Sequence, residues 1–244
     1  MMKKTIKVKN NESGNVLFLI LIAVALFAAL SYAVTSSTRS GGGNANNETN
    51  LVNTASITQY PASIRTAIIR MQISSGVDPQ DLEFNPPSDI TGCTSVPVCV
   101  FDPAGGAAVF ATAIADAMED GQQGDWTFNG DFEIVNVGST TSGNVSGNEI
   151  IAFLPGVKEA VCARINLEVM GSSTIPNTGS SVAGSSSTEG YMHMLTDGVP
   201  FASTNDITLG TGGISGTTAL DGQAFGCFQD NGGDYVYYHV IYES

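Results

Sequence analysis

Four cysteines are the side chains of this sequence whose chemistry is easiest to read. Cys93 and Cys99 flank the short proline-containing loop CTSVPVC, whereas Cys162 lies in the amphipathic stretch EAVCARI and Cys227 in the apolar stretch AFGCF. An even number of cysteines favours disulfides when the chain lies in an oxidising compartment. We therefore predict a loop-closing disulfide between Cys93 and Cys99 and a core disulfide between Cys162 and Cys227, although four cysteines allow three connectivities.

Residues suited to catalysis or metal binding are sparse. His193 and His239 each lie in an expected strand, far from the cysteines in sequence, and no CxxC pair favours zinc. Motifs for a serine nucleophile, a zinc protease or a phosphate-binding loop do not occur. We predict no enzymatic activity, no cofactor and no metal ligands. Calcium at the acidic turns 203–208 and 230–234 is the alternative, although neither turn has the ligand spacing of an EF-hand.

Negative charge is concentrated after residue 14. The 244 residues include nine basic and 23 acidic ones, and four of the basic residues and one acidic residue precede residue 15. The remainder therefore carries a net charge of −17. Such a surface repels phosphate groups, so we expect no nucleic-acid partner and no electrostatic binding to an anionic bilayer surface.

The longest apolar stretch covers residues 16–34. It contains no charged residue, and 12 of its 19 residues are Val, Leu, Ile or Phe. A helix of this length spans about 28 Å, close to the roughly 30 Å hydrocarbon core of a bilayer. Four lysines precede the stretch, so the positive-inside rule predicts a single-pass inner-membrane protein with a cytoplasmic N-terminus and an exported C-terminal part.

A short leader stands directly before the apolar stretch. Residues 1–14, MMKKTIKVKNNESG, are rich in lysine and end at Gly14, and the apolar residues follow with no polar spacer. The N-terminus thus resembles the class III signal of type IV pilins and type II secretion pseudopilins. The resemblance implies that a prepilin peptidase cleaves the chain between Gly14 and Asn15, on the cytoplasmic side, and leaves a mature chain of 230 residues.

The same resemblance implies a structural role. In that family the apolar helix stays with the mature subunit, anchors it in the membrane and later packs against other pilin or pseudopilin subunits in a filament core. Pilins usually carry Glu at the fifth mature position, where this chain has Leu19. The subunit at the tip of a pseudopilus typically lacks this Glu, so the resemblance is to a minor or tip-like subunit or to a divergent pilin-like family.

Two other interpretations of the N-terminus remain open. The stretch meets the requirements of an ordinary single-pass anchor. It also contains Ser31 and Ala33, small residues that would allow a secretory signal peptidase to cleave after Ala33. With either signal, the chain would be an anchored or secreted β-rich binding module for a surface or a polysaccharide. Trp126 and the tyrosines of residues 235–242 would then form an aromatic platform.

Composition divides the chain into a leader at 1–14, a transmembrane helix at 15–34, a linker at 35–50 and an exported domain at 51–244. The linker segment contains three successive glycines, each of which costs a helix about 1 kcal/mol relative to Ala. We therefore predict a flexible, non-helical joint there.

The exported domain alternates between helical and strand patterns. Ile64, Ile68 and Met71 recur at helical spacing and predict an amphipathic helix within 51–74. Further helices are predicted at 109–118 and 156–168, strands at 125–137 (a hairpin or a bulged strand), 149–155, 191–195 and 200–209, and a hairpin at 223–242. The predicted fold class is α+β: a transmembrane and amphipathic N-terminal helix, then a mostly antiparallel β-sheet with an interposed helix, in the order found in pilins.

Overall fold

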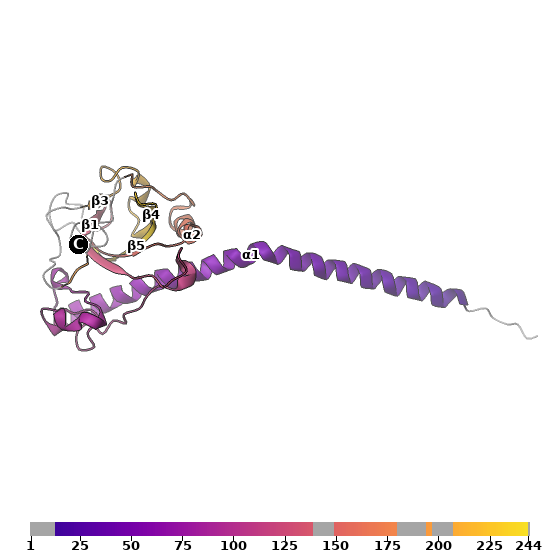
Figure 1. The fold of residues 1–244 in the computed structure, drawn as a ribbon, viewed down its shortest axis with the longest axis horizontal. Coiled ribbons are helices and arrows are strands. Elements are labelled where there is room, and N and C mark those ends of the chain that lie inside the picture. Colours follow the sequence, from indigo (N-terminus) through magenta and orange to yellow (C-terminus); the bar gives the residue numbers. More distant parts are fainter. Residues whose placement is uncertain (1–12, 139–148, 180–193, 197–206, 244) are drawn as a thin grey trace, which may run out of the picture. The chain divides into compact units, whose positions relative to one another are not determined.

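The computed structural model describes residues 13–138, 149–179, 194–196 and 207–243. The chain divides into two compact units, Met1–Glu48 and Thr49–Ser244, which are described separately. Helix α1, Ser13–Ser75, contributes its N-terminal part to the first unit and its C-terminal part to the second (Figure 1). The described part of the first unit consists of α1 alone.

The N-terminal part of α1 is an apolar helix, as predicted. The segment Val16–Thr35 is long and apolar enough to cross a membrane, and none of its residues is buried. Leu and Ala, both strong helix formers, recur through it, so the backbone favours the helix independently of any packing. This is the stretch from which the sequence predicts a single-pass anchor.

The predicted break of helix at 35–50 is wrong, because α1 continues through this segment without interruption. Helix nucleation is costly whereas propagation adds one hydrogen bond for each residue, so a helix that is already formed on both sides extends across weak residues. The glycines lower the stability of the segment without ending it. The boundary between the two units, at Glu48 and Thr49, nevertheless falls inside the predicted linker.

The C-terminal part of α1 buries one face in the second unit. Ile57, Ile64, Ile68 and Met71 belong to a single hydrophobic cluster, at the spacing that places them along one stripe of the helix. Pro61 lies inside the helix without ending it, although it removes one backbone donor from the helical ladder. The predicted amphipathic helix is confirmed.

The second unit is built on a five-stranded sheet in the order β3-β1-β2-β5-β4. Its strands are β1 (Thr127–Ile134), β2 (Glu149–Pro155), β3 (Ile207–Leu209), β4 (Phe225–Gln229) and β5 (Tyr235–Tyr242). Among these strands, β1–β2, β2–β5 and β4–β5 pair antiparallel, while β1–β3 pairs parallel. The class is α+β as predicted, with a mixed sheet.

Two features of the sheet agree with the sequence analysis. Strands β4 and β5 form the predicted hairpin, and β1 is one strand with a bulge between Asn129 and Phe132. A second irregularity lies where β5 pairs with the start of β2. There Tyr242 packs against the same cluster as its neighbour Ile241, so the side chains of β5 stop alternating between the two faces at its last residue.

Each face of the sheet has its own core. The first cluster contains Leu154 and Tyr237 together with residues of α1 and of α2, Glu159–Met170. The second contains Phe153 and Tyr238, the strand neighbours of those two, together with loop residues such as Leu220. Neighbouring residues of β2 and β5 thus enter opposite clusters, because successive side chains of a strand point to opposite faces of the sheet.

The remaining helix and strand predictions have different outcomes. Helix α2 is confirmed and ends at Gly171, whose φ of 69° suits glycine. The helix predicted at 109–118 is wrong: only Ala115–Ala117 forms a single 3-10 turn, because Ala113 instead pairs with Gly124 across a β-bridge. For the two strand predictions after residue 190, β3 confirms the end of the second, while 191–193 and 197–206 lie outside the described residues.

Candidate functional site

The predicted cleavage site lies at the beginning of α1. The helix starts at Ser13, so the bond between Gly14 and Asn15 lies in its first turn. The rest of the leader, residues 1–12, lies outside the described residues. No observation on the structure tests cleavage at this bond, and it stays a prediction.

The apolar surface that follows is the largest exposed one on the described chain. Leu19, at the fifth position after Gly14, is 59% exposed, and its neighbours on all sides of the helix are exposed to a similar degree. An apolar surface of this size is unfavourable in water, since each Å² costs about 25 cal/mol. This apolar surface is therefore suited to burial, either against lipid or against other apolar helices.

The predicted core disulfide joins α2 to β4. Cys162 and Cys227 are bonded to each other and fully buried, with their Cα atoms 5.4 Å apart. Beside the bond, the Asn166 amide donates to the Cys227 carbonyl oxygen at 3.0 Å and accepts from the Cys227 backbone N–H at 2.8 Å. The sequence analysis missed this clamp, because a lone Asn in a helix gives no signal that it is buried.

The predicted loop disulfide between Cys93 and Cys99 is also present. The carboxylate of Glu83 lies next to it and accepts hydrogen bonds from the backbone N–H and the hydroxyl of Thr94, at 2.8 and 2.6 Å. Glu83 and the two cysteines are the one group among the described residues with three potential ligand atoms within 4.8 Å of one another. Because both sulfur atoms are committed to a disulfide, they cannot act as thiolate ligands.

Three of the aromatic residues predicted to form a binding platform lie in the core, and the other two, Tyr235 and Tyr242, are partly buried. Trp126 is 4% exposed, and Tyr237 and Tyr238 are fully buried on opposite faces of the sheet. Trp126 packs against Tyr60 of α1, with ring centroids 5.2 Å apart. The platform prediction is therefore wrong: period-two alternation with both faces buried hides the rings that an exposed sheet would present.

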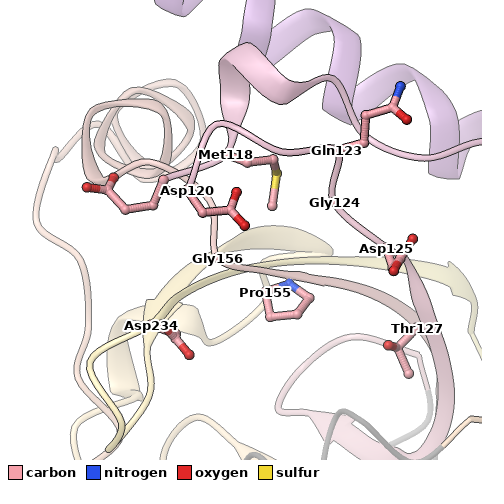
Figure 2. Close-up of a pocket in the computed structure, with 10 residues that line it drawn as sticks. Met118, Asp120, Gln123, Gly124, Asp125, Thr127, Pro155, Gly156 and Asp234 are labelled. Carbon is pink, nitrogen blue, oxygen red and sulfur yellow. The ribbon is translucent and has the colours of Figure 1, made fainter.

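A cavity of about 500 Å³ opens between the loop Met118–Asp125, the end of β2 and the β4–β5 turn (Figure 2). Its lining residues include four carboxylates, those of Glu119, Asp120, Asp125 and Asp234, and no basic residue. These oxygens do not converge into a group of three ligand atoms among the described residues. One of them already accepts from the backbone, since Asp120 caps the N–H of Gln122 at 2.9 Å. The cavity is acidic but is not arranged to bind a metal ion.

Burial shifts the pKa values of several titratable side chains on the sheet, among them Glu149 and His239. Burial, together with the nearby carboxylates of Glu133 and Glu243, raises the pKa of Glu149 to about 8, against the hydrogen bond from the backbone N–H of Ile134. Burial, with the guanidinium of Arg65 as the second cause, lowers the pKa of His239 to about 4. A neutral His239 shares a hydrogen bond of 2.7 Å with the Tyr237 hydroxyl, which suits a structural role in the core.

Comparison with protein-family models, with curated proteins and with solved structures found no match for this chain. Its function is therefore argued from its own residues.

Proposed function

We propose that this chain is a structural, non-enzymatic subunit of the pilin or pseudopilin type. A prepilin peptidase cleaves it between Gly14 and Asn15, and the apolar part of α1 holds the mature subunit in the inner membrane. The subunit then joins other pilin or pseudopilin subunits through that helix. The second unit, Thr49–Ser244, lies on the periplasmic or extracellular side.

A single observation carries the proposal. Helix α1 is continuous from Ser13 to Ser75, wholly unburied over Val16–Thr35 and buried along one stripe within the second unit. An exposed apolar segment of this length must be covered by lipid or by other helices. A helix that is fixed at one end to a folded unit and bare at the other end can move from lipid into a helical bundle without refolding.

Leu19 supports a minor or tip-like position. An ionised carboxylate within an apolar helix is costly unless it meets an opposite charge. Leu19 needs no such partner, because its side chain is as apolar as the lipid around it. A subunit with Leu at this position is suited to a site where no second subunit supplies an N-terminal amine above it.

The proposal is tested by cross-linking in cells. A photoreactive amino acid at Leu26, on the exposed apolar helix, should yield discrete adducts between this chain and other helical membrane subunits. The matched control carries the same probe together with Gly14→Val, which blocks cleavage and keeps the apolar helix intact. We expect the protein adducts to disappear in the control. Adducts with lipid alone, or the same protein adducts in both chains, would contradict assembly through the processed helix.

A further inference from the structure

Three carboxylates gather at one end of the sheet, and we call them the carboxylate cluster: Glu133 on β1, Glu149 at the start of β2 and Glu243 just after β5. These three strands are neighbours, with β2 in the middle. The register pairs Phe132 with Glu149 and Ile150 with Tyr242, so Glu149 lies between the other two. Both neighbours act on Glu149 electrostatically.

Glu149 is the member of the cluster that is completely buried. Its Oε2 atom accepts a hydrogen bond of 2.8 Å from the backbone N–H of Ile134. Its Oε1 atom has no hydrogen-bond partner among the described residues. Burial, one unsatisfied oxygen and two like charges nearby all favour the protonated, neutral form of this carboxyl group over the ionised one.

The cluster is connected to α1. Arg65 forms an ion pair with Glu243, with 2.9 Å between Nη1 and Oε1, and Arg65 also acts on His239 of β5. Among the described residues, the charged groups that act on Glu149 are thus Glu133 from β1 and Glu243, which follows β5, and Arg65 of α1 is paired with Glu243. An ionised Glu149 would repel the carboxylate of Glu243, which pairs with Arg65 of α1.

We propose that Glu149 is a proton-sensitive lock between the sheet and the C-terminal part of α1. With the proton bound, the ends of β1, β2 and β5 stay closed, and the exposed Arg65–Glu243 pair adds to the apolar packing that holds α1 on the sheet. When the proton is lost, the charge on Glu149 repels Glu133 and Glu243, draws water to this end of the sheet and loosens the attachment. The lock is independent of the proposed role in assembly.

Amide hydrogen exchange of the full chain in detergent micelles, read by mass spectrometry at pH 6 and pH 9, tests the lock. After correction for the intrinsic exchange rate, peptides from β1, β2 and β5 should lose at least tenfold in protection at pH 9. The peptide that covers the middle of α2, which lies away from the cluster, should not change. In Glu149→Gln, which keeps the shape and stays neutral, the difference between the two pH values should vanish.

Two further variants keep the test decisive if Glu149→Gln folds poorly. Glu133→Gln removes one like charge, so the loss of protection should move to a lower pH, because Glu149 then ionises more easily. Glu83→Gln alters a carboxylate whose two oxygens both bind Thr94, so the pH dependence at the cluster should persist. Equal protection at pH 6 and pH 9 in the wild type, or an unchanged midpoint in Glu133→Gln, would overturn the proposal.

Discussion

Asn166 connects α2 to β4, the strand that the Cys162–Cys227 disulfide joins to the same helix. Its side chain makes three hydrogen bonds, to the carbonyl oxygens of Thr174 and Cys227 and from the backbone N–H of Cys227, and it is fully buried. Removal of the side chain leaves the two buried backbone groups of Cys227 unsatisfied, at a cost of roughly 1–3 kcal/mol each. The side chain therefore contributes stability out of proportion to its size.

We predict that Asn166→Ala lowers the free energy of unfolding by about 3 kcal/mol, as measured by denaturant titration of the full chain in detergent. Asn177→Ala is the matched control, because Asn177 is exposed and its amide donates an exposed hydrogen bond of 2.9 Å to the side-chain oxygen of Gln229. The control should cost less than about 1 kcal/mol. Equal losses of unfolding free energy in the two variants would show that the buried hydrogen bonds of Asn166 contribute no more stability than the exposed ones of Asn177.

His239 makes the protein sensitive to acid. Its pKa is about 4 in the folded chain, against an ordinary value of 6.5, so the unfolded chain binds the proton more tightly. The stability that this difference contributes is complete above about pH 6.5 and is lost as the pH falls toward 4. We predict that His239→Gln reduces the loss of unfolding free energy between pH 7 and pH 4 by about 2 kcal/mol. If the variant loses as much as the wild type, His239 is not the responsible group.

Neither Asn166 nor Glu149 could be singled out from the sequence. Each is a single polar residue beside apolar neighbours, and the pattern allows either a buried or an exposed side chain. Burial is decided by partners distant along the chain: Cys227 for Asn166, and strands β1 and β5 for Glu149. By contrast, the cysteine partners were predicted, because one pair flanks a short loop and each cysteine of the other pair lies in a stretch with a visible apolar pattern.

The two disulfides close loops of very different length and should differ in effect. The sequence separation is 6 residues for Cys93–Cys99 and 65 for Cys162–Cys227. On the chain-entropy model, removal of the first disulfide costs about 2 kcal/mol and removal of the second about 4 kcal/mol. Denaturant titration of the double variants C93A/C99A and C162A/C227A checks the order. A larger loss for the short loop would contradict it.

Elements with strong periodicity were predictable, and those that depend on context were not. The amphipathic part of α1, helix α2 and the β4–β5 hairpin each carry their own pattern and their own end signals. The alanines of 109–118 favour a helix locally, but the bridge between Ala113 and Gly124 draws the segment into an extended path. At 35–50 the sequence predicts a non-helical joint but the chain is helical, because the helix formed on both sides extends across the weak segment.

At the scale of the whole molecule, charge and apolar surface are separated along the chain. The part after residue 14 carries a net charge of −17, whereas Val16–Thr35 has no charged residue. This division suits a protein whose apolar segment lies in a membrane or a filament and whose acidic part lies in water. The proposed function depends on this division more than on any single side chain of the second unit.

The mature N-terminus, determined by mass spectrometry of the protein from cells with and without prepilin peptidase, tests the central claim most directly. Ala33→Leu serves as a matched variant, because it blocks cleavage by a secretory signal peptidase and leaves the leader unchanged. We predict a chain that begins at Asn15 when the peptidase is present, in the wild type and in this variant alike, and an uncleaved chain when it is absent. A chain that begins at Val34, or one uncleaved in both kinds of cell, would contradict the account.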